Sequence, residues 1–126
     1  MQYSIEMLAG RRLIIVSTSG EATLAGIKSY IDELVNPPYS EVDYNVLIDL
    51  RELNMASLTS TDVRRIVDIV AANRNIVLPV KQALVVSTKL SFGLSRMYEL
   101  LAIENDPQTT QVFYSYDEAM DWLCSS

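Results

Sequence analysis

Polar and apolar residues alternate at the start of the chain. Tyr3, Ile5 and Met7 are separated by polar residues, and this period of two is typical of a strand with one buried face. After a turn at residues 9–12, the continuous apolar run 13–16 predicts a more fully buried strand, followed by a loop over residues 18–23. These segments together predict an N-terminal antiparallel hairpin.

Further along the chain, helical and strand patterns follow each other in turn. Apolar residues three and four positions apart predict helices over residues 24–35, from about 60 to 70, from about 91 to 101, and over 116–123. Thr23, either Thr59 or Ser60, and Ser115 are suitable N-cap residues for three of them. The apolar runs 46–48 and 83–86 predict central strands, and residues 111–114 predict a short last strand.

The order of these elements indicates one architecture. Strands that alternate with helices are typical of a parallel sheet with right-handed crossovers. We therefore predict a single α/β domain over residues 1–126, with a mixed sheet of about five strands, an N-terminal antiparallel hairpin, a parallel core and four helices. The pattern leaves open whether the helices cover one face of the sheet or both.

Composition limits the classes of partner. Ten Lys and Arg against sixteen Asp and Glu give a net charge of −6, which disfavours binding to nucleic acid or to an anionic membrane surface. No apolar run reaches the roughly 18 residues of a membrane span, and residues 1–6 do not resemble a signal peptide, so we expect no membrane insertion. The single cysteine, Cys124, fits a reducing compartment, and we expect the protein in the cytoplasm.

The chain lacks the residues on which most catalytic sites depend. The chain has no histidine and one cysteine, which disfavours a zinc site and a serine–histidine catalytic pair. Its four glycines are isolated, so no phosphate-binding loop is present. We therefore expect a protein that is not an enzyme and that has no catalytic residues, no metal and no cofactor.

Several residues are candidates for binding a ligand or a partner. Asp49 and Arg51 stand at the end of a predicted central strand, where ligands bind in open parallel sheets. Asp49 would either orient a ligand or fix the loop by accepting backbone hydrogen bonds. Ser91 and Phe92 open the third predicted helix, and Arg96 is placed to stack on Phe92. Phe92 either lines a pocket or packs on the core.

Hydroxyl groups gather where the second predicted helix begins. Ser57, Thr59 and Ser60 are candidates for phosphorylation, because a helix N-terminus stabilises a phosphoryl group. The alternative is helix capping alone, which needs one of these hydroxyl groups.

Several segments resemble one bacterial family. Residues 46–51 (VLIDLR) with the hydroxyl-rich segment after them, residues 83–86 and 92–99, and residues 112–123 are similar to STAS-type domains, the SpoIIAA-like fold of anti-sigma-factor antagonists. The resemblance in layout covers essentially the whole chain and implies a non-catalytic domain that binds a partner protein. In the best-known members, a kinase phosphorylates a serine in an Asp-Ser-Ser/Thr-Gly signature. Here Leu58 stands close to that position within residues 56–61 (ASLTST), so a phosphorylation switch would use Ser57, Thr59 or Ser60 instead.

Three functions remain open from the sequence. The first is a regulatory or protein-interaction domain with a protein partner, controlled by Ser/Thr phosphorylation. The second is a small-molecule or lipid-binding domain with a pocket near Asp49 and Phe92. The third is an enzyme that uses carboxylates, or Lys89 and tyrosines. A homodimer formed through the edge of the first strand is compatible with each of them.

Overall fold

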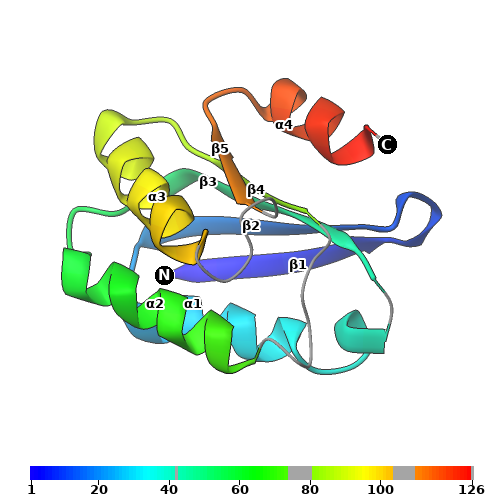
Figure 1. Ribbon diagram of the computed structural model, residues 1–126, viewed down its shortest axis with the longest axis horizontal. Helices are drawn as coiled ribbons and strands as arrows, with labels where there is room; N and C mark the ends of the chain where they lie inside the picture. The colour runs from blue at the N-terminus through cyan, green and yellow to red at the C-terminus, as the bar shows by residue number, and fades with distance from the viewer. Residues whose placement is uncertain (42, 74–80, 104–109, 126) are drawn as a thin grey trace.

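Five strands form one mixed sheet in the computed structural model, which describes residues 1–41, 43–73, 81–103 and 110–125. The strands follow the order β1-β2-β3-β4-β5 across the sheet (Figure 1). Their bounds are β1 (Gln2–Leu8), β2 (Leu13–Glu21), β3 (Asn45–Asn54), β4 (Gln82–Val85) and β5 (Thr110–Phe113). β1 pairs with β2 in antiparallel fashion, and every other pairing is parallel. The predicted sheet, hairpin and parallel core are confirmed.

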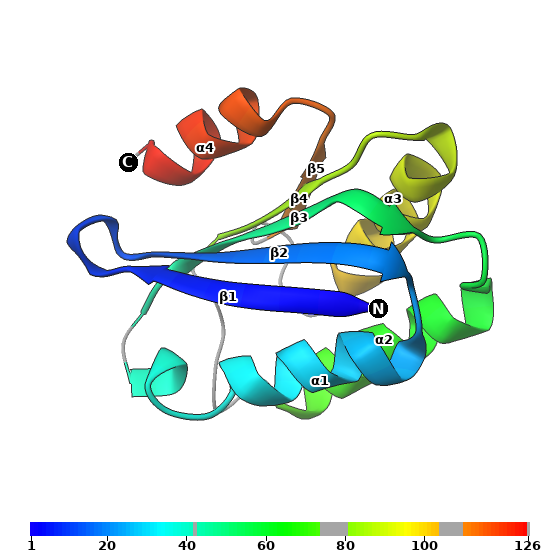
Figure 2. The same ribbon diagram turned by 180° about the vertical axis from the view of Figure 1, so that it is seen from behind.

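Helices cover both faces of the sheet, which the sequence left open. The α-helices of the described residues are α1 (Leu24–Leu34), α2 (Ser60–Ala72), α3 (Lys89–Ala102) and α4 (Tyr116–Cys124), with short 3-10 turns at Ala9–Arg11 and Tyr39–Glu41. Figures 1 and 2 show α4 alone on one side of the sheet and α1 and α2 on the other. Side chains of α3 belong to the same buried cluster as those of α1 and α2. In the described ranges, no helix combines the length and the apolar composition that a membrane span requires.

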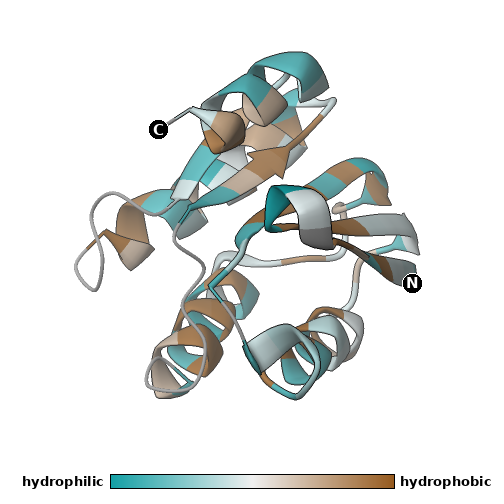
Figure 3. Cartoon of the chain, turned by 90° about the vertical axis from the view of Figure 1, so that its right-hand side faces the viewer, coloured by the Kyte–Doolittle hydropathy of each residue, from teal (hydrophilic) through white to brown (hydrophobic). Residues whose placement is uncertain are grey.

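Alternation along β3 divides the core into two clusters. Val46, Ile48 and Leu50 face the three-helix side and are at most 5% exposed. Leu47, which is fully buried, faces α4 together with residues of β2, β4 and α4 itself. A strand that is apolar on both faces needs cover on both, and the continuous apolar run 46–48 is consistent with this arrangement. Figure 3 shows hydrophobic bands beside hydrophilic bands on the helices. This pattern is expected of helices that bury one face against the sheet and expose the other.

The second and third strands are longer than their apolar runs indicate. β2 and β3 pair beyond the end of β4, with Ser19 opposite Glu52 and Glu21 opposite Asn54, after an irregularity in register between Ser17 and Ser19. Most residues of this extension are polar and exposed. Hydrophobic periodicity does not predict this extension. The extension is held by backbone pairing between β2 and β3, and few of its side chains are buried.

Polar contacts fix α4 to the far end of the sheet. The Asn45 side-chain amide donates to the carbonyl oxygen of Leu123 at 2.7 Å, and its oxygen accepts from the backbone N–H of Lys81. The Lys81 ammonium group donates to the carbonyl oxygen of Trp122 and lies 5.2 Å from the centre of the Trp122 ring. A cation beside the last carbonyl groups of a helix also balances the helix dipole.

Thr59 caps α2 with a complete capping box. Its hydroxyl oxygen accepts the backbone N–H of Asp62, and the Asp62 carboxylate accepts the backbone N–H of Thr59. The structure thus selects Thr59 over Ser60, which becomes the first residue of the helix.

We expect Thr59→Ala to lower the free energy of unfolding by about 1 kcal/mol, because it removes a helix N-cap. The neighbouring substitution Ser60→Ala is the matched control and should change stability by less than about 0.5 kcal/mol. Urea denaturation of both variants measures the difference. Equal effects would contradict the assigned cap.

Candidate functional site

An apolar cavity of about 120 Å³ lies between the sheet and helices α1, α2 and α3. Its floor comes from the inner face of the sheet, and its walls come from the inner stripes of the three helices. The described lining residues are Ile14, Ile27, Tyr30, Ile31, Leu34, Val35, Tyr39, Tyr44, Val46, Ile48, Leu50, Met55, Leu58, Val63, Ile66, Val70, Asn73, Gln82, Leu84, Leu94, Ser95 and Tyr98. Most are aliphatic or aromatic, and none of them carries a formal charge at neutral pH.

Local sequence explains why each element contributes to this lining. Strand residues point to alternate faces, so residues 46, 48 and 50 of β3 reach the cavity and residues 47 and 49 do not. On α2, residues 63, 66 and 70 recur at three- and four-residue spacing and form one stripe. On α1, residues 27, 30, 31 and 34 do the same. The cavity is therefore bounded by the same positions that make these elements amphipathic.

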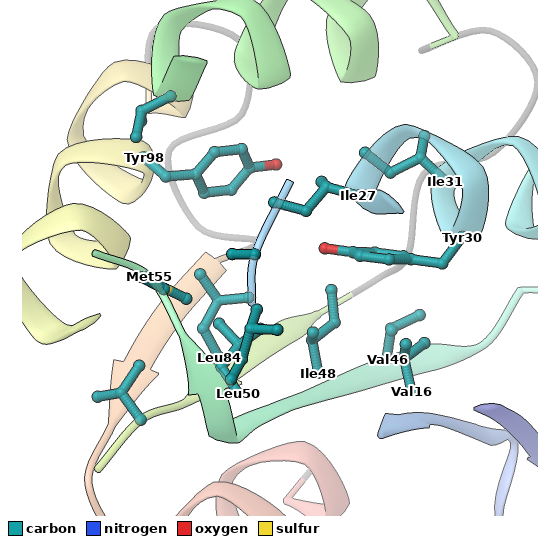
Figure 4. Packing of buried hydrophobic residues seen from close by; sticks show 14 of the residues in the cluster. Val16, Ile27, Tyr30, Ile31, Val46, Ile48, Leu50, Met55, Leu84 and Tyr98 are labelled. Atoms are coloured by element: carbon teal, nitrogen blue, oxygen red, sulfur yellow. The ribbon is translucent and has the colours of Figure 1, made fainter. Parts of the chain in front are cut away.

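Two tyrosines give this apolar cavity a polar centre. Tyr30 of α1 and Tyr98 of α3 are 6% and 8% exposed. Figure 4 shows their hydroxyl ends pointing toward one another across the space above Ile48 and Leu50. Burial raises the pKa of Tyr98 to about 12, and burial together with the nearby Tyr98 raises the pKa of Tyr30 further above its usual value. Both phenol groups therefore stay neutral and keep their protons at any physiological pH.

A surface contact holds the Tyr30 ring in place. Tyr3 of β1 packs edge-on against it, with the ring centres 5.9 Å apart and the planes at 64°. The Tyr3 hydroxyl donates to the Glu33 carboxylate at 2.5 Å, and this bond raises the pKa of Tyr3 to about 12. The contact ties the edge strand to α1 and limits rotation of the buried Tyr30 side chain.

Asp49 lies on the opposite face of the sheet from this cavity. Its carboxylate accepts two hydrogen bonds from the Arg51 guanidinium group, at 2.9 and 2.8 Å, and one from the Arg51 backbone N–H at 3.1 Å. The hydrogen bonds from Arg51 hold the pKa of Asp49 below its usual value despite partial burial. Arg51 in turn lies over the Tyr116 ring of α4, with its central carbon 4.9 Å from the ring centre. Asp49 thus orients Arg51 against α4 and fixes the backbone, as one of its two predicted roles required.

The cavity is therefore not placed as the sequence predicted. A pocket near Asp49 and Phe92 was expected, yet neither residue lines the cavity found between the sheet and α1–α3. The prediction placed Asp49 at the carboxyl end of β3, whereas the strand continues to Asn54. At position 49 the alternation of the strand directs the side chain toward α4.

The candidate site residues of α3, which are Ser91, Phe92 and Arg96, make contacts within the helix or with neighbouring side chains. Thr88 is the N-cap, and its hydroxyl donates to the hydroxyl oxygen of Ser91, which is 2% exposed. Phe92 stacks in parallel on Tyr114, with ring centres 4.9 Å apart, and packs against the three-helix core. Arg96 pairs with Glu99 at 2.6 Å, so the predicted stacking of Arg96 on Phe92 is wrong. Glu99 lies three residues after Arg96, a spacing at which oppositely charged side chains of a helix meet.

The three hydroxyl groups before α2 have different surroundings. Ser57 is exposed, and its hydroxyl donates to the Glu21 carboxylate at the end of β2. Thr59 is occupied as the helix cap, whereas Ser60 is exposed in the first turn. Leu58 between them lines the cavity. This segment therefore touches the cavity with one side chain and presents its neighbours to solvent.

Comparison with known proteins establishes the fold. Neither the protein-family models nor the curated proteins compared with the chain give a match. Among solved structures, it is similar to an uncharacterized protein of the DUF3478 family with a SpoIIAA-like fold from Shewanella loihica PV-4. The sequences are 17% identical, the TM-score is 0.59, and the match covers 98% of this chain and 93% of that chain. This chain has a SpoIIAA-like fold. The predicted resemblance is confirmed at the level of fold, which by itself assigns no function.

The sequence pattern predicts Tyr98 as a core residue of α3, whereas Tyr30 is not among the predicted core positions of α1. Tyr98 belongs to the predicted inner stripe of α3, and Tyr30 follows Ile27 by three residues, which places it on the inner face of α1. The available signal was a tyrosine at a core position, since a buried phenol group requires a partner or a special environment. Nothing in the sequence indicates that the two hydroxyl groups point toward one another.

We expect stability to decrease as the pH rises above about 10, in part through Tyr98. The folded protein keeps the Tyr98 proton up to a pKa of about 12, whereas the unfolded chain releases it near 10.0. The stability that this difference provides is fully present below pH 10 and is lost as the pH rises toward 12, by up to about 1.4 kcal/mol per pH unit. Chemical denaturation of the wild type and of Tyr98→Phe, from about pH 9 to about pH 11, should give a shallower decrease for the variant.

The same substitution at the exposed Tyr114 is the control for this measurement. Equal pH dependence in Tyr98→Phe and Tyr114→Phe would contradict the role given to Tyr98.

Proposed function

We propose that this chain is a non-catalytic binding domain that holds a small, mostly apolar ligand between its sheet and helices α1–α3. The observation that carries the proposal is the cavity of about 120 Å³ with its aliphatic and aromatic lining. An engineered protein cavity of about 150 Å³ with a similar lining binds benzene. A ligand of about six or seven heavy atoms therefore fits, and the volume does not suit a whole lipid.

The residues around the cavity support binding without catalysis. Its described lining has tyrosine, serine, asparagine and glutamine as polar residues, and it includes no carboxylate, amine or thiol. The chain also has no histidine. General acid–base and nucleophilic catalysis need a group whose pKa lies near the working pH, and burial moves the pKa values of Tyr30 and Tyr98 away from that range.

The expected affinity is modest because the ligand is small. A dissociation constant of about 0.1–1 mM corresponds to a binding free energy of about −4 to −5.5 kcal/mol, which is well inside the limit for a molecule of this size. Binding of this strength suits a domain that responds to the concentration of a metabolite.

Benzene is the direct probe of the cavity. In ¹H–¹⁵N NMR spectra, we expect saturable shift changes at residues of α1, α2 and α3 that line the cavity, and none at α4. At about ten times the dissociation constant, the ligand should stabilise the protein by about 1.4 kcal/mol. Val63→Phe should abolish both effects, because Val63 lines the cavity and a phenyl ring would fill part of it.

Val67→Phe is the matched control, since Val67 lies one turn later on α2 and is not among the lining residues. It should bind benzene as the wild type does. Absence of saturable changes in the wild type would overturn the proposed function.

A second candidate is the regulatory protein-interaction domain that the sequence predicted, and the contact between Ser57 and Glu21 supports it. A phosphoryl group on Ser57 would replace that hydrogen bond with repulsion between two anions, and the exposed segment before α2 would change its shape and charge. On Ser60, a phosphoryl group would lie beside the free N–H groups of the first turn of α2. Such a change is one that a partner protein can recognise.

For protein purified from its own host, we expect an intact mass increased by one phosphoryl group, located at Ser57 or Ser60. Thr59 should stay unmodified, because its hydroxyl oxygen caps α2. The double variant Ser57→Ala/Ser60→Ala should lose the mass increase. Unmodified wild-type protein, or modification at Thr59, would contradict this candidate.

Two further expectations, on location and on oligomeric state, are compatible with both candidate functions. The single Cys124 supports a location in the cytoplasm. β1 is an edge strand of the sheet, and its outer backbone groups are suited to pairing with a second copy of the chain. Analytical ultracentrifugation would distinguish a monomer from a dimer.

A further inference from the structure

We infer that the cavity selects a neutral ligand with a carbonyl group, whose oxygen accepts hydrogen bonds from the hydroxyl groups of both Tyr30 and Tyr98. This inference rests on the proposed function and adds the chemical class of the ligand. Its basis is that the hydroxyl ends of these two buried tyrosines point toward one another in a cavity whose lining is mostly apolar.

The two hydroxyl groups are placed to donate to a ligand. Tyr30 and Tyr98 are each more than 90% buried as residues, and no hydrogen bond among the described residues joins either hydroxyl group to another side chain or to the backbone. No described side-chain oxygen or nitrogen is both fully enclosed and without a partner, so the two hydroxyl oxygens are open to the cavity that both residues line. Each hydroxyl group can donate to a molecule in the cavity, and one such hydrogen bond contributes about 0.5–1.5 kcal/mol net. A ligand that supplies an acceptor gains these hydrogen bonds, and an apolar ligand of the same shape does not.

Charge narrows the ligand class. The described lining has no cation that could balance a carboxylate and no anion that could balance an amine. Burial of an unpaired ion in an apolar site is unfavourable by several kcal/mol. The site therefore disfavours charged ligands, even though phenol groups can hydrogen-bond to them.

The number of donors favours a carbonyl oxygen among neutral acceptors. Each neutral phenol group donates one hydrogen bond, and burial keeps both protonated. A carbonyl oxygen has two lone pairs in one plane and can accept both bonds at a single atom. With a volume of about 120 Å³, a cyclic or short-chain ketone of about seven heavy atoms matches both the space and the donors.

The test compares cyclohexanone with methylenecyclohexane, in which a CH₂ group replaces the carbonyl oxygen and the shape is kept. NMR titrations give the dissociation constants for the wild type, Tyr30→Phe, Tyr98→Phe and the double variant. We expect the double variant to bind cyclohexanone about tenfold more weakly than the wild type does, with smaller losses in the single variants. Methylenecyclohexane should bind equally well to all four proteins, because the rings that line the cavity remain.

Tyr114→Phe is the control, since Tyr114 is an exposed tyrosine that is not among the lining residues. It should leave cyclohexanone binding unchanged. Equal cyclohexanone affinity in the wild type and the double variant would overturn this inference, and so would a loss in Tyr114→Phe equal to that in the double variant.

Methylenecyclohexane distinguishes a failure of the inferred ligand class from a failure of the proposed function. If methylenecyclohexane and benzene bind but the ketone shows no dependence on Tyr30 and Tyr98, the proposed function holds and the inferred ligand class is wrong. If none of the three molecules binds, the proposed function itself fails. Retained methylenecyclohexane binding also shows that a tyrosine variant is folded with an intact cavity.

Discussion

The alternation of side chains along β3 is the constraint on which the rest of the structure depends. β3 lies in the middle of the sheet between β2 and β4, and its residues 46–50 point in turn to one face and the other. Val46, Ile48 and Leu50 require cover from α1, α2 and α3, and Leu47 requires cover from α4. A shift of one residue in register would exchange these sets and expose both.

The two faces meet this requirement in different ways. α4 lies close against its face, held by the contacts of Asn45 and Lys81 at one end and by Arg51 over Tyr116 at the other. The opposite face is covered by three helices, α1, α2 and α3. The cavity lies between these helices and the sheet, in contrast to the close packing expected of a protein interior.

This division also separates two kinds of candidate residue. The polar residues that stand out in the sequence, Asp49 and Arg51, stabilise the α4 side and hold an exposed part of the sheet. The hydroxyl groups that the cavity offers belong to tyrosines that pack as core residues. The segment before α2 connects the two kinds, because Leu58 reaches the cavity while Ser57 and Ser60 face solvent. A SpoIIAA-like fold is compatible with either role, so function must be argued from these sites.

The sequence by itself determined the order and type of the elements, since hydrophobic periodicity and N-cap residues are local signals. The hairpin, the parallel core and the caps at Thr23 and Ser115 were all readable in this way, whereas the cap of α2 was left open between Thr59 and Ser60. Only the tertiary structure decided the extension of β2 and β3 through polar residues, the face on which each helix lies, and the side to which Asp49 points. It also decided that Tyr30 and Tyr98, 68 positions apart in the chain, share one cavity. These features depend on pairing and packing between distant segments, and no local pattern of residues records them.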